Sequence, residues 1–281
     1  MLISEYKKEF LSQLKNEYPP EEANSFFNIL IKFYLGWERI DLALDPTKEI
    51  NPAETGILDN ALNKLLDHEP IQYITGETEF FGNRFKVNSN VLIPRPETED
   101  LVQWTIDDLK EKNAIKILDI GTGSGCIAIS LAKVFPNAGM CAMDVSEEAL
   151  KVAEGNAALN KTEINFVQED VLGLDSLTEK FDVIVSNPPY VRELEKEQMQ
   201  KNVLEHEPGL ALYVKDNDPL IFYKKITKLA EEGLNPGGRI YFEINQYLGD
   251  QTLEIVTKAG FETELRKDIF GNDRMIRGIK K

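Results

Sequence analysis

The sequence positions with the clearest capacity for chemistry are Asn187, Pro188, Pro189 and Tyr190. They follow Phe181–Ser186, an apolar and β-branched run that predicts a buried strand. Proline lacks an N–H and cannot extend a sheet, so the strand is expected to end here. Ligands of open α/β sheets bind beyond the carboxyl ends of the strands. The pattern therefore predicts an amide side chain, a rigid turn and an aromatic ring at a ligand-binding edge, rather than a plain strand and proline turn.

A glycine-rich turn after the apolar run 117–118 is the second candidate site. Its candidate cofactor-binding residues are Asp119, Gly121, Thr122, Gly123, Ser124 and Gly125. Glycine lets a backbone pass close beneath a ligand. The spacing Gly-x-Gly-x-Gly differs from the Gly-x-Gly-x-x-Gly of dinucleotide enzymes, and no lysine follows directly as in a P-loop. The turn therefore predicts a ligand without a pyrophosphate at the helix N-terminus.

Two acidic residues follow the next strands along the chain. Asp144 comes after the predicted strand 139–143, where a carboxylate can accept hydrogen bonds from both hydroxyls of a ribose. Asp170 and Val171 come after the predicted strand 164–168, where they can accept from an adenine amine and pack on its ring. A single aspartate in such a place often only caps a helix. Their placement at successive strand ends favours a nucleoside site.

Strands and helices alternate after residue 114. The predicted strands are 116–120, 139–143, 164–168, 181–186, 239–244, 261–267 and 274–279. The predicted helices are 126–134, 147–159, 219–232 and 251–259, the last with Gly260 at its end. This alternation predicts an α/β fold with a doubly wound, mostly parallel, seven-stranded sheet.

The first part of the chain has a different pattern. Apolar residues recur there at helical spacing in three segments, which Pro19-Pro20 and Pro70 interrupt, so a small helical bundle is expected. Turns at Gly76 and Gly82-Asn83 predict a hairpin with strands at 78–81 and 84–87. A helix is then expected from Glu97 to Leu109. The predicted domains are a helical domain at 1–75, a β-hairpin linker at 76–96 and a ligand-binding domain at 97–281.

Charge and composition limit the function classes. The 281 residues carry a net charge of −16, which disfavours broad binding to nucleic-acid phosphates and favours a basic protein partner. No apolar run reaches membrane-spanning length and no secretory signal is apparent, so a cytoplasmic location is expected. Cys126 and Cys141 are predicted to be buried small hydrophobes. His68 and His206 lack metal-ligand spacing, so no metal is expected.

Taken together, the glycine turn, Asp144, Asp170 and the 187–190 segment resemble a class I S-adenosylmethionine-dependent methyltransferase. Further motifs resemble the release factor glutamine N5-methyltransferase family (HemK/PrmC type). They are Pro70–Ile74, Phe80-Phe81-Gly82, Ile93–Glu99, Glu207-Pro208, Ala211-Leu212, Pro236–Gly238, Phe242–Ile244 and Gly271–Arg274. One departure is Asn245, where the family usually has glycine; a slight change of the local turn is expected.

This resemblance implies a Rossmann-like methyltransferase domain, S-adenosylmethionine as cofactor and S-adenosylhomocysteine as product. It implies as substrate the glutamine of the Gly-Gly-Gln motif of class 1 peptide chain release factors, so the enzyme would support translation termination. The helical domain would recognise that substrate. Arg95 and Glu97 would join the 187–190 segment in binding it, and Asn187 would also face the cofactor. No direct binding to nucleic acid or membrane is implied.

An amide nitrogen is a poor nucleophile because its lone pair is delocalised into the carbonyl. We therefore expect the Asn187 side-chain oxygen and the Pro188 carbonyl to accept its two N–H groups, with Tyr190 against the flat amide. Catalysis would then consist mainly of orientation and charge stabilisation.

Three alternatives stay open at this point. A DNA adenine-N6 methyltransferase has a chemically similar target amine, but the acidic charge and the lack of an obvious basic recognition domain disfavour it. An RNA guanine methyltransferase is disfavoured for the same reason. A non-catalytic binding module is disfavoured by the intact glycines, Asp144 and 187–190 segment.

Overall fold

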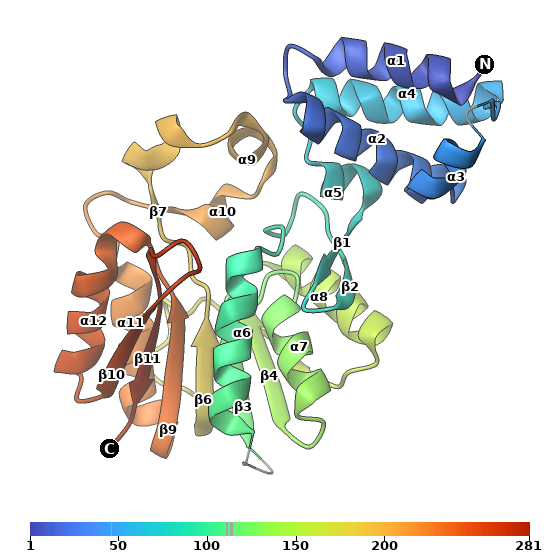
Figure 1. The fold of residues 1–281 in the computed structure, drawn as a ribbon. Coiled ribbons are helices and arrows are strands. Elements are labelled where there is room, and N and C mark those ends of the chain that lie inside the picture. Colours follow the sequence, from blue (N-terminus) through green and yellow to red (C-terminus); the bar gives the residue numbers. More distant parts are fainter. Residues whose placement is uncertain (46, 111, 113–114) are drawn as a thin grey trace. The chain divides into compact units, whose positions relative to one another are not determined.

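The computed structural model describes residues 1–45, 47–110, 112 and 115–281. Two compact units are present (Figure 1). The helical unit comprises Met1–Gly76 and Gln200–His206, and the sheet unit comprises Glu77–Met199 and Glu207–Lys281. The helical unit therefore includes a short segment that lies far along the chain, outside the predicted range 1–75.

The helical unit is built from amphipathic helices around one apolar core. Its helices are α1 (Ile3–Leu14), α2 (Pro20–Leu35), α3 (Arg39–Leu44), α4 (Pro52–Leu66), α5 (Ile71–Thr75) and α9 (Lys201–His206). Local signals set their ends: Pro20 and Pro52 begin helices, and the Asn51 side chain accepts the N–H groups of Ala53 and Glu54. The fully buried core includes Phe10, Leu14, Phe27, Leu30, Ile31 and Leu65. In α9, the His206 ring Nε2 lies 2.7 Å from the Asp67 carbonyl oxygen.

The sheet unit contains a seven-stranded sheet in the order β10-β11-β9-β6-β3-β4-β5. The strands are β3 (Lys116–Ile120), β4 (Gly139–Asp144), β5 (Asn165–Gln168), β6 (Phe181–Ser186), β9 (Leu234–Glu243), β10 (Glu262–Lys267) and β11 (Asp273–Ile279). The ladder from β9 to β5 is parallel, and β11 is antiparallel to both β9 and β10. The predicted seven-stranded, mostly parallel sheet is confirmed, with strands 116–120 and 181–186 at their predicted bounds.

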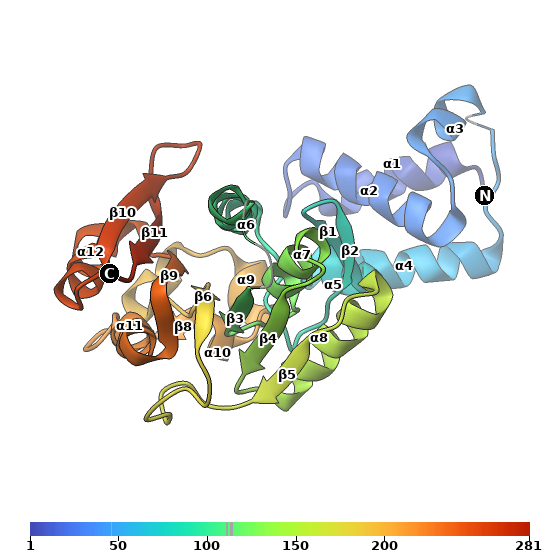
Figure 2. The same ribbon diagram turned by 90° about the horizontal axis from the view of Figure 1, so that it is seen from below.

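Helices cover both faces of this sheet (Figure 2). One core joins alternate strand residues such as Ile117 and Val183 to α6 (Pro96–Leu109), α7 (Cys126–Val134) and α8 (Glu147–Asn160). The other joins the intervening residues, such as Leu118 and Ile184, to α11 (Ile221–Gly233) and α12 (Gly249–Lys258). Because successive strand residues point to opposite faces, near-continuous apolar runs bury both faces at once. Cys126 and Cys141 are free and buried in these cores, as predicted.

The predicted hairpin exists as β1 (Glu77–Phe80) and β2 (Asn83–Lys86) and belongs to the sheet unit. Phe80 and Phe85 are buried in the same core as α6 and α7. The buried Asn156 side chain of α8 accepts the Lys86 N–H at 2.6 Å and donates to the Lys86 carbonyl at 2.9 Å. The hairpin is thereby attached firmly to the sheet unit.

Between residues 191 and 214 the structure has short elements that the sequence patterns did not predict. They are β7 (Val191–Arg192), the 3₁₀ helix η1 (Glu193–Gln198), α9, α10 (Gly209–Leu212) and β8 (Tyr213–Val214), and another 3₁₀ helix, η2 (Gln246–Leu248), follows β9. Each is shorter than two helical turns or a typical strand, so it has no usable hydrophobic period. In the described ranges, none of the helices has both the length and the apolar surface that crossing a bilayer demands.

Candidate active site

A cavity of about 370 Å³ lies where β3, β4, β5 and β6 end. Eight of the residues proposed from sequence line it: Gly121, Gly123, Asp144, Asp170, Val171, Asn187, Pro188 and Pro189. The other predicted site residues are not among its lining residues: Asp119, Thr122, Ser124, Gly125, Tyr190, Arg95 and Glu97. The predicted edge of the sheet thus has a ligand-sized hollow, lined by about half of the predicted site residues.

The glycine turn forms the floor of the cavity. The N–H groups of Gly121 and Thr122 both donate to the Met143 carbonyl of β4, at 2.8 and 3.0 Å. At Gly125, φ is +80°, and a Cβ atom would lie 3.0 Å from the Ile129 side chain and 3.2 Å from that of Ala153. Only glycine combines that backbone conformation with so close an approach of α7 and α8. The turn is therefore attached to the end of β4, and a Cβ atom on Gly121 or Gly123 would meet nothing within 4 Å.

Asp119 supports this turn from below. Its side chain is fully buried, and its Oδ2 accepts the Thr122 hydroxyl at 2.7 Å and the Ala128 N–H at 3.2 Å. Its Oδ1 has no hydrogen-bond partner among the described residues. Burial raises the pKa of this carboxyl to about 7, against the hydrogen bonds, which act in the opposite direction. Asp119 therefore fixes the turn and does not reach the cavity; direct contact with a cofactor stays a prediction.

This burial makes a prediction for Asp119→Asn. An aspartate of the unfolded chain has a pKa of about 4, whereas Asp119 of the folded chain has a pKa of about 7. Between these two pH values the folded chain binds more protons at Asp119 than the unfolded chain does. The contribution of Asp119 to the free energy of unfolding therefore falls as pH rises. Asparagine keeps one acceptor for Thr122 and Ala128 but cannot ionise. The free energy of unfolding of the variant, relative to the native chain, should therefore rise by roughly 1.4 kcal/mol per pH unit at most across this window.

Urea unfolding followed by tryptophan fluorescence checks this prediction. The chain has two tryptophans, Trp37 and Trp104, so a Trp37→Phe background leaves Trp104 of the sheet unit as the reporter. The asparagine adds a buried donor at the Oδ1 position, which lowers stability equally at every pH. Only the slope is diagnostic: parallel pH profiles for the two proteins would contradict an elevated pKa at Asp119.

Asp144 and Asp170 carry carboxylates into the cavity wall. Asp144 Oδ2 accepts the Gly123 N–H at 2.9 Å, and its Oδ1 accepts the Ser146 N–H at 3.0 Å. Asp170 Oδ1 accepts the Leu172 N–H at 2.9 Å. A carboxylate oxygen has two acceptor positions, so each of these oxygens can accept one further hydrogen bond. The aspartates thus serve as local caps and remain able to bind a ligand.

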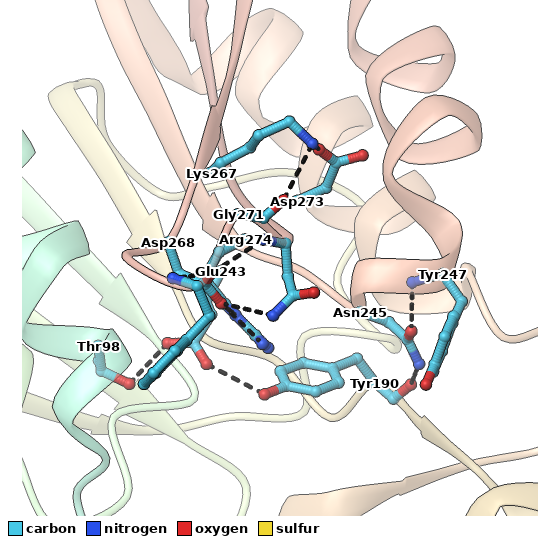
Figure 3. Close-up of polar contacts among 12 residues, drawn as sticks. Thr98, Tyr190, Glu243, Asn245, Tyr247, Lys267, Asp268, Gly271, Asp273 and Arg274 are labelled. Atoms are coloured by element: carbon cyan, nitrogen blue, oxygen red, sulfur yellow. Dashed lines mark hydrogen bonds and ion pairs between the residues drawn. The ribbon is translucent and has the colours of Figure 1, made fainter.

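Asn187 lines the cavity and also belongs to a polar network that is buried on the far side of the cavity wall. Its side-chain Nδ2 donates to the Thr98 hydroxyl at 3.2 Å, and this hydroxyl donates to Glu243 Oε2 at 2.6 Å. The Tyr190 hydroxyl donates to the other oxygen, Glu243 Oε1, at 3.0 Å (Figure 3). Thr98 and Glu243 are 2% and 1% exposed. The network joins the first turn of α6, the end of β9 and both ends of the Asn-Pro-Pro-Tyr segment.

The pKa of the buried Glu243 carboxyl lies above its ordinary value, as the net result of opposing influences. Burial raises its pKa, and the nearby Glu97 acts in the same direction. The hydrogen bonds from Thr98 and Tyr190 and the positive charge of Arg274 act in the opposite direction and favour the carboxylate. Arg274 in turn lies 3.2 Å from Asp268 Oδ2 (Figure 3). Burial and the Glu243 charge also raise the pKa of the Tyr190 hydroxyl, which keeps that hydroxyl a donor.

Asn245 fixes the chain that leaves this segment. Its Nδ2 donates to the Tyr190 carbonyl and to Glu195 Oε2, both at 3.0 Å, and its Oδ1 accepts the Tyr247 N–H at 2.9 Å (Figure 3). Its φ is −66°, a conformation that does not require glycine. The asparagine therefore adds three hydrogen bonds and caps η2 without backbone strain.

Arg95 and Glu97 flank the same region. The Arg95 guanidinium forms an ion pair with Glu207 at 2.6 Å, and the buried Glu207 also accepts the Ile93 N–H at 3.3 Å. Glu97 lies half-buried in the first turn of α6. Neither residue faces the cavity, so their predicted contact with a substrate stays a prediction.

Sequence reasoning missed the connecting residues Thr98, Glu207 and Glu243 as site residues. One signal could have found Glu243: a carboxylate inside an apolar strand must have partners, because burying an unpaired charge is costly. It also missed the cavity walls at 89–92 and 208–211. Pro208 and Ala211 of these walls belong to motifs of the family resemblance, but no chemistry of their side chains indicates that they line a cavity.

Comparisons with known proteins show the family and the fold of the chain. Residues 5–76 match a family model described as PrmC N-terminal domain, and residues 102–209 match one described as Methyltransferase small domain. A methyltransferase structure from Pyrococcus furiosus has the same fold, with a TM-score of 0.53, 20% identity and coverage of 79% of this chain and 98% of that chain.

Two relatives extend over nearly the whole chain. The release factor glutamine methyltransferase of Bacteroides thetaiotaomicron is 43% identical over 94% of this chain and 95% of its own length. That of Flavobacterium psychrophilum is 51% identical over 99% of both chains. With this similarity along its full length and a methyltransferase-type sheet, the chain belongs to the release factor glutamine methyltransferase family.

Proposed function

We propose that this protein transfers a methyl group from S-adenosylmethionine to the side-chain amide nitrogen, N5, of the Gly-Gly-Gln glutamine of class 1 release factors. The observation that carries the proposal is the Asn187 side chain at the cavity wall, with its Nδ2 bonded to Thr98. That bond leaves the Asn187 oxygen free to accept an N–H from a planar amide. The names of the relatives support the choice of a release factor as substrate.

The residues around the cavity fit the proposed cofactor. Gly121 and Gly123 have φ of +76° and +55°, and a Cβ atom on either would point into open space, so the backbone can lie directly against a ligand. Asp144 has acceptor capacity for ribose hydroxyls, Asp170 has it for an adenine amine, and Val171 gives an apolar wall. When bound, the cofactor supplies a methyl group on a positively charged sulfur.

The segment 187–190 prepares the acceptor nitrogen. Asn187 Oδ1 and the Pro188 carbonyl accept its two N–H groups, which holds the nitrogen lone pair towards the methyl group. Transfer would form the bond from this nitrogen to the methyl carbon, leave the electron pair of the carbon–sulfur bond on the sulfur, and release one N–H proton to solvent. The same two oxygens stabilise the positive charge that develops on nitrogen. The Tyr190 hydroxyl is bonded to Glu243, which fixes the ring; contact of this ring with the substrate amide stays a prediction.

The helical unit is proposed to bind the body of the release factor. Ile40 and Leu44 are four residues apart on α3 and are 60% and 77% exposed, which provides apolar surface for a protein partner. The net charge of −16 favours a partner with basic surface. It also disfavours DNA, the substrate of the alternative adenine-N6 reaction.

Incubation with S-adenosylmethionine labelled on the methyl group tests the proposal. We expect label on a class 1 release factor and none on the same factor with the Gly-Gly-Gln glutamine replaced by alanine. Label on DNA instead, or label on the release factor despite that replacement, would overturn the assignment. Binding of S-adenosylhomocysteine without any transfer would favour the binding module.

A further inference from the structure

The polar network around Asn187 has a fixed donor order when Glu243 is ionised. In that form its carboxylate can only accept hydrogen bonds. The two oxygens of Glu243 accept one hydroxyl each, Oε2 from Thr98 and Oε1 from Tyr190. The proton of the Thr98 hydroxyl is therefore committed to Glu243.

This order fixes the orientation of the Asn187 amide. With its proton committed, the Thr98 oxygen offers only lone pairs to Asn187, and these can accept only from Nδ2. The opposite orientation would place Oδ1 against the Thr98 oxygen, two acceptors without a proton between them. A threonine alone could not enforce the choice, since a hydroxyl both donates and accepts. Glu243 is the member of the network that makes the Thr98 hydroxyl a donor on one side and an acceptor on the other.

We propose that Glu243 is a positioning residue that acts through Thr98 to hold the Asn187 carboxamide with its oxygen towards the acceptor amide. This inference rests on the proposed methyl transfer to glutamine. In the wrong orientation Asn187 would present N–H groups to the substrate N–H groups, and the nitrogen would lose one of its two anchors. Through Tyr190, the same carboxylate fixes the other end of the segment.

We call the path from Glu243 through Thr98 to Asn187 the relay. A series of substitutions at position 98 tests it in the full-length enzyme. Thr98→Val keeps the shape of the side chain and removes the hydroxyl, so we expect kcat for release factor methylation to fall about 10–100-fold, the worth of a hydrogen bond to a charged group. The KM for S-adenosylmethionine should change little. Thr98→Ser restores a hydroxyl and should regain most of the kcat that valine loses.

Thr105→Val is the matched control. Thr105 is also fully buried in α6, but its hydroxyl donates to the Leu101 carbonyl of its own helix at 2.9 Å and, within the part of the chain that the structure describes, to no member of the network. Its replacement removes a buried hydroxyl from the same helix without touching the network, so kcat should stay near the native value. If Thr105→Val lost as much kcat as Thr98→Val, the loss at position 98 would be explained by general damage to α6, and the relay would be overturned.

Glu243→Gln tests the carboxylate itself. Glutamine has nearly the same shape but can donate as well as accept, so it no longer dictates the direction of the Thr98 proton. We expect a fall in kcat similar to that of Thr98→Val. Should glutamine prevent folding, the position 98 series still decides the question.

Double variants separate positioning from a purely structural role. If Thr98 acts through Asn187, then adding Thr98→Val to Asn187→Ala should cost no further activity in single-turnover assays; Glu243→Gln is left out of this comparison because Glu243 also bonds Tyr190. Additive losses would overturn the relay. Failure of the native enzyme to label any release factor would instead overturn the proposed function, whereas native activity with an undiminished Thr98→Val overturns only the relay.

Discussion

Replacing Asn187 with alanine is expected to lower kcat for release factor methylation by about 10²–10³-fold, the effect of removing one preorganised hydrogen-bonding group from a reacting centre. The variant loses an acceptor whose orientation the Thr98 and Glu243 network holds in place. The adjacent strand β6 is buried on both faces and does not depend on this side chain. The affinity for S-adenosylhomocysteine should therefore change little, as measured by isothermal titration calorimetry.

Asn137→Ala provides the control for this variant. Asn137 is exposed in the turn between α7 and β4, at the opposite end of the strands from the cavity. Its replacement removes the same carboxamide without approaching the site, so kcat should stay near the native value. Near-native methylation by Asn187→Ala would refute the role of the Asn187 oxygen, whatever the control does.

The positions of Asn187, Asp144 and Asp170 could be predicted because each depends on the end of one strand. Apolar runs define where these strands stop, and parallel strands bring their carboxyl ends to one edge. The cavity found there is lined by all three residues. Local chemistry and sheet topology are sufficient for this part of the site.

The network behind the wall could not be predicted in the same way. Thr98 and Glu243 are separated by 145 positions, and nothing local in the first turn of α6 indicates which strand it will meet. The region between 191 and 214 failed for a different reason. Its elements are held by single pairs, such as Arg192 with Glu195 at 3.0 Å and Asn245 with Glu195, rather than by a periodic apolar face.

The two kinds of failure have one physical basis. Hydrophobic periodicity records which face of an element is buried, whereas a polar contact across elements records only that two partners eventually meet. Asp119 is a residue whose position near the site could be predicted from the sequence but whose hydrogen-bond partners could not. Its place near the end of an apolar strand, beside the glycine turn, predicts contact with the cofactor, and this stays a prediction. The structure shows its side chain fully buried beneath the turn and bonded to Thr122 and Ala128, so the contacts that it makes hold the turn itself.

Asp144 gives the second large effect, on cofactor affinity rather than on turnover. Asp144→Asn replaces one carboxylate oxygen with an N–H₂ group, which then faces the N–H of either Gly123 or Ser146. The variant loses the negative charge that we propose accepts the ribose hydroxyls, and it strains the glycine turn at the same time. We expect the Kd for S-adenosylhomocysteine to rise about 10–100-fold, because hydrogen bonds to charged groups contribute roughly 1.5–3 kcal/mol.

The division between KM and kcat makes this result specific. Once S-adenosylmethionine is saturating, the acceptor amide still meets an intact Asn187, so the variant should retain most of its kcat. Asp175→Asn, at an exposed position in the loop before β6, removes the same charge from the sheet unit away from the cavity and should leave both constants near native. An Asp144→Asn enzyme with native cofactor affinity would show that the ribose is held elsewhere. An Asp144→Asn enzyme that kept its cofactor affinity and lost kcat would instead place Asp144 beside the acceptor amide. That result would contradict the assignment of separate positions for the cofactor and the amide along this edge of the sheet.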